Sequence, residues 1–88
     1  MDRVSPESMQ YYDQAVTDKM MMKYGWDRMQ ALKAFTGSRT YAMLLDRRNG
    51  MTQFGADGIM DIWENEQITG QPGTSIYLRE ESSKYEDE

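Results

Sequence analysis

The stretch SPESMQYYDQAVTDKMMMKYG, residues 5–25, decides the fold because it carries the start, the body and the end of one helix. Ser5 can cap free N–H groups, Pro6 is tolerated at the first helical position, and Gly25 can take the left-handed conformation that ends a helix. At about 100° per residue, one set of apolar side chains falls within an arc of about 120°. The set is Met9, Tyr12, Val16, Met20 and, at the end, Tyr24. We therefore predict a helix over residues 6–23 with this stripe facing a core.

The same helix carries a second apolar strip. Tyr11, Ala15 and Met22 lie nearly opposite the first stripe, with Met21 alongside. A small bundle covers one stripe of such a helix, so the second would stay in water unless another chain covers it. Protein interfaces favour Tyr and Met. We predict an exposed contact strip for a protein partner or a homodimer, formed by Tyr11, Ala15, Met21 and Met22. The alternative is that other segments of the chain wrap both sides of the helix.

Three further helices follow, each preceded by a capping residue. We place them at residues 28–36, 39–47 and 58–67, with Asp27, Ser38 and Asp57 as caps. Gly-containing breaks at residues 36–38, 49–50 and 69–73 separate or end them. Residues 51–54 are too short to assign and could be extended. The predicted fold class is all-α, a small bundle of about four helices.

The core of this bundle needs more than aliphatic side chains. Leu, Ile, Val and Phe number only 12, so the nine Met, six Tyr and two Trp must complete it. We expect the buried residues to be Met9, Tyr12, Val16, Met20, Leu32, Phe35, Tyr41, Leu44, Leu45, Ile59, Ile62 and Trp63. The helical domain is predicted to span residues 1–70. A flexible, acidic and disordered tail is predicted at 71–88, within which residues 74–79 could form one short strand.

The composition excludes several chemistries. The 88 residues contain neither His nor Cys, which removes His-assisted and Cys nucleophiles, zinc sites with N or S ligands, and disulfides. The lack of Cys fits a reducing compartment. Residues 1–10 lack the apolar region of a signal peptide, and the longest hydrophobic run, residues 41–45, is far below the ~20 residues of a membrane span. We expect a cytoplasmic protein without membrane association.

Two acidic patterns are compatible with a metal or catalytic site. Residues 53–64 match an EF-hand loop at Asp57, Gly58 and Glu64 but lack its first and third ligands. Asp57, Asp61 and Glu64 have i, i+4, i+7 spacing, yet acid–base catalysis also needs a concave, partly desolvated pocket. The thioethers of residues 20–22 suit Cu(I), but adaptable packing explains them more simply. We expect no metal, no cofactor and no catalytic residues, and therefore no enzyme.

Charge is unevenly distributed along the chain. Residues 19–48 carry seven basic and two acidic side chains between two acidic segments, while the whole chain has a net charge of −5. Pairing within the chain explains this pattern as well as an anion-binding face does. Residues 28–47 also have the outline of a helix-turn-helix. The alternative function is a DNA-binding regulator that uses the basic segment Lys33 to Arg48 as a degenerate helix-turn-helix. The nucleic-acid contacts would be Lys33, Arg39, Thr40, Arg47 and Arg48.

A family resemblance is carried by Ser38-Arg39-Thr40-Tyr41, Leu44-Leu45-Asp46, Gly50 and Trp63-Glu64-Asn65-Glu66. These segments resemble a small family of uncharacterised bacterial helical domains, sometimes encoded near toxin and antitoxin genes. The resemblance covers about residues 27–66. It implies a small helical accessory or regulatory protein and supplies no catalytic residues. With the second strip, it leads to our main prediction, a small protein-interaction or regulatory module that binds a protein partner or itself.

Overall fold

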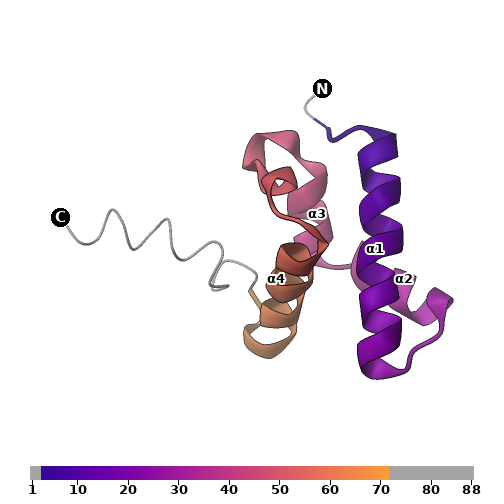
Figure 1. Ribbon diagram of the computed structural model, residues 1–88. Coiled ribbons are helices and arrows are strands. Elements are labelled where there is room, and N and C mark those ends of the chain that lie inside the picture. Colours follow the sequence, from indigo (N-terminus) through magenta and orange to yellow (C-terminus); the bar gives the residue numbers. More distant parts are fainter. Residues whose placement is uncertain (1–2, 72–88) are drawn as a thin grey trace.

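A computed structural model describes residues 3–71 and shows an all-α bundle, as predicted. Within this range lie four α-helices and two short 3-10 turns between the third and fourth helices (Figure 1). They are α1 (Pro6–Tyr24), α2 (Arg28–Thr36), α3 (Arg39–Leu45), η1 (Arg47–Asn49), η2 (Met51–Gln53) and α4 (Ala56–Thr69). The predicted tail, apart from Gln71, and the predicted strand at 74–79 lie outside the described residues.

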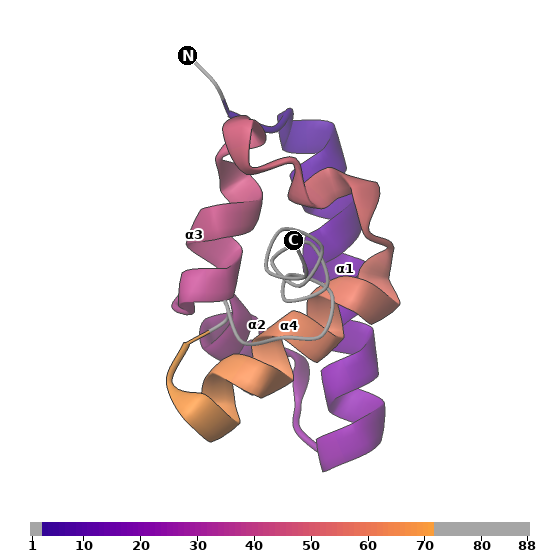
Figure 2. The ribbon, with the colours of Figure 1, turned by 90° about the vertical axis from the view of Figure 1, so that its left-hand side faces the viewer.

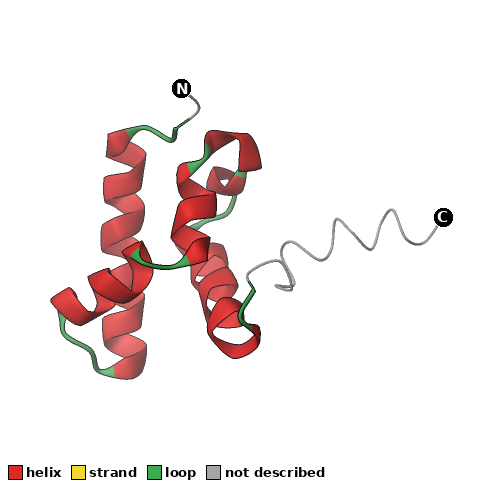
Figure 3. Ribbon diagram, turned by 180° about the vertical axis from the view of Figure 1, so that it is seen from behind, coloured by secondary structure: helices red, strands yellow, loops and turns green. Residues whose placement is uncertain are grey.

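α1 lies along one edge of the molecule. The α3–α4 pair faces α1 on one side (Figures 1 and 2). The 3-10 turns η1 and η2 connect α3 to α4 at the end of the molecule near the N-terminus. α2 crosses α1 and then passes through a short link to α3 (Figure 3). In the part of the chain that the structure describes, no helix is both long enough and apolar enough to cross a membrane.

The predicted caps hold three of the four helices. Ser5 Oγ accepts a hydrogen bond from the Ser8 N–H at 3.2 Å, Asp27 accepts one from Gln30 at 2.7 Å, and Ser38 accepts one from Tyr41 at 3.1 Å. Gly25 has a φ of 70°, the left-handed conformation expected at the end of α1. Local sequence therefore fixes the boundaries of α1 and α2 to within one residue.

The segment between α3 and α4 differs from the prediction in three ways. α3 ends at Leu45 because the Asp46 carboxylate caps a new 3-10 turn by accepting from the Arg48 N–H at 3.0 Å. Residues 51–53 form a second 3-10 turn and are not extended. α4 begins at Ala56 after Gly55, so Asp57 lies in its first turn and is not its cap. The predicted start of α4 is therefore two residues late.

Most of the predicted core is confirmed. The buried members are Met9, Tyr12, Val16, Met20, Phe35, Leu44, Ile59, Ile62 and Trp63. The prediction is wrong for three residues, which are only half-buried: Leu32, Tyr41 and Leu45. Ala31 is fully buried in place of Leu32, because α2 packs closely on α1 through small Ala31 and, one turn later, Phe35. The prediction missed Val4, Met51, Ala56 and Met60, which are also buried.

Candidate functional site

The outer face of α1 presents two large apolar side chains to water. Tyr11 is 56% exposed and Met22 is 88% exposed, whereas Ala15 between them is half-buried. Asp18 lies on the same face, since residues 11, 15, 18 and 22 follow i, i+4, i+7, i+11 spacing along α1. We call Tyr11, Ala15, Asp18 and Met22 the outer strip. Figure 1 shows α1 at the edge of the bundle, on the side away from α3.

Met21 lies beside this strip. Like Ala15, it is half-buried and packs against the hydrophobic core. One residue corresponds to about 100° of rotation around a helix, which turns Met21 away from the direction of Met22. Two of the four predicted contact residues, Ala15 and Met21, thus pack against the core, and Asp18 takes a place on the outer surface that the sequence analysis did not assign.

An open groove runs beside the outer strip, between α1 and the first turn of α4. Its volume is about 720 Å³, and residues of both helices line it, including the whole outer strip, Lys19 and residues 55–58. A second hollow of about 270 Å³ lies on the same helix and is lined by Tyr11, Gln14, Ala15 and Asp18. The outer strip is thus flanked by concave surface, which a protruding side chain of another chain can enter.

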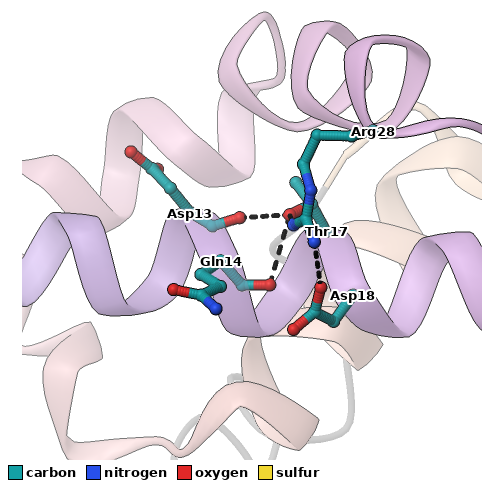
Figure 4. A network of polar contacts seen from close by, with 5 residues as sticks. All are labelled: Asp13, Gln14, Thr17, Asp18 and Arg28. Carbon is teal, nitrogen blue, oxygen red and sulfur yellow. Dashed lines mark hydrogen bonds and ion pairs between the residues drawn. The ribbon is translucent and has the colours of Figure 1, made fainter.

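Ion pairs fix the polar rim of the groove. Lys19 of α1 pairs with Asp57 of α4, and Arg28 of α2 pairs with Asp18 at 2.5 Å. Arg28 also donates to the Thr17 hydroxyl, at 2.8 Å. The Thr17 hydroxyl in turn donates to the backbone carbonyls of Asp13 and Gln14 in α1 (Figure 4). Exposed pairs of this kind contribute little stability. Their effect is to orient the side chains of Asp18 and Lys19 at the surface.

Asp13 lies on the α2 side of α1, beside a polar hollow of about 420 Å³. Its Oδ1 atom is buried and has no hydrogen-bond partner within residues 3–71. Burial raises the pKa of the Asp13 carboxyl, and a hydrogen bond with Tyr41 only partly offsets this. Burial, together with the nearby Asp13 carboxylate, also raises the pKa of the Tyr41 hydroxyl. Both shifts disfavour the charged form of the group concerned.

The acidic residues of the predicted metal-site patterns have separate partners in the structure. Asp57 pairs with Lys19, whereas Glu64 bonds to Lys23 and Tyr24. Burial alone would raise the pKa of Glu64, but these two hydrogen bonds outweigh it and hold the pKa below its ordinary value. Among residues 3–71, no group of three or more acidic side chains converges on a point that could hold a metal ion.

The methionines of residues 20–22 have three different environments. Met20 is fully buried, Met21 is half-buried and Met22 is exposed. Their sulfur atoms therefore serve packing and the outer surface separately, which does not fit a shared ligand set.

Not all residues of the predicted helix-turn-helix are available for contact with nucleic acid. Lys33, Arg39, Arg47 and Arg48 are exposed, but Thr40 is fully buried, so its assignment as a nucleic-acid contact is wrong. The Glu66 carboxylate of α4 accepts from the N–H groups of Arg39 and Thr40, both at 2.9 Å, and from the Thr40 hydroxyl at 2.7 Å. This negative charge occupies the start of α3, where a recognition helix would approach DNA.

Most of the central basic segment is paired within the chain. Its partners in the described structure are Asp57 for Lys19, Glu64 for Lys23, Asp18 for Arg28 and Asp46 for Arg48. Four of the seven basic residues in the segment 19–48 are thereby accounted for. Pairing within the chain explains the uneven charge better than an anion-binding face does.

Sequence reasoning missed the groove residues 55–58 and the role of Lys19. They come from α1 and from the start of α4, more than 35 positions apart, so no local pattern joins them. The 4-3-4 spacing of the outer strip is the one signal that pointed to Asp18. Comparison with protein families, with curated proteins and with solved structures gives no match for this chain.

Proposed function

We propose that this protein is a small interaction module that binds a protein partner, or a second copy of itself, through the outer strip of α1. One observation carries the proposal: Met22 and Tyr11 are largely exposed on one helix face beside a groove of about 720 Å³. A Met side chain left this open gains nothing from folding the monomer. Covering it with another chain would remove apolar surface from water without the cost of forming a helix, because α1 is already folded in the monomer.

The shape of the surface favours a helical partner. The outer strip spans 11 residue steps, or ~17 Å of helix. Its spacing is that of anchors recognised when one helix lies along another. A polar rim of Asp18, Lys19 and Asp57 surrounds the apolar centre, as in ordinary protein interfaces.

A regulatory role follows as part of the same proposal. The resemblance of residues 27–66 to bacterial helical domains supports an accessory or regulatory protein, and the absence of Cys from the sequence fits the cytoplasm. Several of the ionisable side chains described above, including Lys19, Asp57 and Glu66, are engaged in caps and ion pairs, which supports binding over catalysis.

Capture experiments with matched variants test the proposal. The full chain, Tyr11→Ala/Met22→Ser and the control Met29→Ser are immobilised and exposed to extract of the native host. Met29 is 61% exposed but lies on α2, so its loss should leave a partner bound to α1 in place. The proposal expects a protein that the full chain and the control retain and the double variant loses.

A titration with duplex DNA addresses the alternative. Fluorescence anisotropy at low and moderate salt reports phosphate-driven binding through its steep salt dependence. Tight, salt-dependent binding that Arg39→Ala weakens, together with unchanged capture and self-association by the double variant, would overturn the interaction module in favour of a DNA regulator.

A further inference from the structure

A second concave surface lies where the segment before α1 meets the turns η1 and η2, at the end of the bundle near the N-terminus (Figures 1 and 2). A hollow of about 280 Å³ opens there, and we call it the N-terminal hollow. Two basic and three hydroxyl side chains line it, and none of its lining residues is acidic. The lining residues are Arg3, Val4, Ser5, Ser8, Arg47 and Thr52. None of them lines the groove beside the outer strip.

Backbone pairing brings the two arginines of the N-terminal hollow together. Arg3 forms an antiparallel bridge with Asp46, and the Val4 N–H donates to the Leu45 carbonyl at 2.9 Å. Arg47 follows Asp46 directly and begins η1. The two cations therefore come from segments more than 40 positions apart, and the fold holds them at one hollow although like charges repel each other. An anion placed between them would relieve that repulsion.

No carboxylate of the described chain neutralises these two guanidinium groups. Neither Arg3 nor Arg47 takes part in an ion pair there. The carboxylate next to Arg47 in the sequence is engaged elsewhere, because Asp46 Oδ1 accepts from Arg48 Nε at 3.1 Å and Oδ2 accepts from its terminal nitrogen at 2.8 Å. Glu7, in the first turn of α1, is exposed and does not line the hollow. A chain with a net charge of −5 thus leaves two cations unpaired at one place.

Hydroxyl groups add further donors to the N-terminal hollow. The Ser5 hydroxyl donates to Ser8 Oγ at 3.1 Å, so the Ser8 hydroxyl keeps its own hydrogen for another acceptor. Thr52 contributes a third hydroxyl, and its carbonyl accepts from the Tyr12 hydroxyl at 3.2 Å, which ties this residue to α1. The lining therefore combines fixed positive charge with side-chain donors, which is the chemistry that binds oxyanions.

We propose that the N-terminal hollow binds the phosphate group of a phosphate monoester. A carboxylate presents two oxygens, which the fork of a single Arg satisfies. A phosphate monoester has three terminal oxygens and a charge of about −1.5 to −2 at neutral pH, so it can accept from both guanidinium groups and from a hydroxyl at once. This site shares no residue with the outer strip, so the inference goes beyond the proposed function.

The charge of the chain favours a monoester over the phosphodiesters of a nucleic acid. Nucleic-acid binding depends on many phosphate contacts along a basic surface. This chain is acidic overall, and four of the seven basic residues in the segment 19–48 have partners within the chain. Arg47 is among the three that do not. Two unpaired arginines at one hollow suit a single phosphate group.

NMR titration of the full-length ¹⁵N-labelled chain tests the site, with methyl phosphate as the probe. At pH 7.5 this monoester is mostly a dianion, since its second pKa is about 6. At constant ionic strength, the amides of residues 3–8, 47 and 52 should shift and saturate, with a dissociation constant on the order of 1 mM. Dimethyl phosphate and acetate, which carry one charge each, should bind at least about tenfold more weakly.

Matched double variants separate the hollow from general charge. Arg3→Gln/Arg47→Gln should raise the dissociation constant for methyl phosphate at least about tenfold, because charge-assisted hydrogen bonds are lost. Lys33→Gln/Arg39→Gln removes the same charge at exposed positions outside the hollow and should bind like the natural chain. Thermal melts within about 4 °C of the natural chain show that both variants fold.

Three results would overturn the phosphate site. The first is a natural chain whose amide shifts do not saturate by ~20 mM methyl phosphate. The second is equal weakening by the two double variants, which would show attraction by overall charge. The third is equal binding of dimethyl phosphate or acetate by the natural chain, and this comparison needs no variant. Capture of a protein partner through the outer strip is independent of all three.

Discussion

Tyr12 and Phe54 lie 42 positions apart in the sequence, yet the Tyr12 hydroxyl donates a 2.8 Å hydrogen bond to the Phe54 backbone carbonyl. The same hydroxyl also reaches the Thr52 carbonyl, at 3.2 Å. These bonds hold the segment before α4 against α1. Residues 55–58, which line one wall of the groove beside the outer strip, follow this anchored segment directly.

Removing that hydroxyl should destabilise the fold and loosen the groove. Tyr12→Phe keeps the ring but leaves two carbonyls without their donor, which should cost about 1–2 kcal/mol in urea unfolding. Tyr11→Phe is the matched control, since its side chain is exposed, and it should change stability by less than ~0.5 kcal/mol. Equal losses of unfolding free energy in the two variants would show that the Tyr12 hydrogen bonds do not contribute to stability.

Alkaline titration tests the contact between Tyr24 and Glu64. Burial, and then the hydrogen bond and charge of Glu64, raise the pKa of Tyr24 to about 12. Since the folded-state pKa lies above the unfolded value, this group stabilises the fold below about pH 10 and loses that contribution as the pH rises further. Ultraviolet difference spectroscopy should show Tyr24 ionising last, and Glu64→Gln should bring its pKa down. An ordinary pKa in the natural chain would contradict the contact.

The Glu66 cap of α3 should give acid-sensitive stability. Burial alone would raise the pKa of Glu66, but hydrogen bonds from Arg39 and Thr40 outweigh it and lower the pKa. The stability that it supplies is therefore present above the unfolded pKa and is lost as the pH falls through the folded value. Glu66→Ala should cost about 1–2 kcal/mol at neutral pH, and the cost should shrink in acid. Gln67→Ala, an exposed neighbour, is the control, and melting curves across pH give the measurement.

Asp13 should make the stability of the fold depend on pH in the opposite sense to Glu66. Because burial raises the pKa of its carboxyl in the folded chain, protonation favours the folded state. The stability of the natural chain relative to Asp13→Asn should therefore improve as the pH falls through the folded pKa toward the unfolded one. Following the Asp13 carboxyl carbon by NMR gives the pKa directly. A value at or below that of a model peptide would contradict the burial of Oδ1.

The sequence predicted those parts of the fold that depend on near neighbours. Ser5, Asp27 and Ser38 act within three residues of their targets, so their caps could be predicted from local pattern alone. The first stripe of α1 followed from helical periodicity in the same way. For α2, periodicity favoured Leu32 as the buried residue, but Ala31 is buried in its place. The reason is the close approach of α1, which is a property of the packed bundle.

The candidate site was predictable only in part. Tyr11 and Met22 followed from the second strip, because a single helix face is a local property. The groove could not be predicted, because it depends on Tyr12 bringing the segment before α4 onto α1. The burial of Thr40 was equally hidden, since its partner Glu66 is 26 positions away. The packing of Ala15 and Met21 against the core also did not follow from the helical pattern, because α1 contacts the core on more than one side.

One measurement tests the outer strip most directly. A concentration series by analytical ultracentrifugation compares the natural chain with Tyr11→Ala/Met22→Ser, and thermal melts run alongside. The account predicts that the natural chain gains mass with concentration, while the double variant stays monomeric and keeps its stability to within ~1 kcal/mol. A double variant that loses several kcal/mol, as core truncations do, but associates like the natural chain would contradict it.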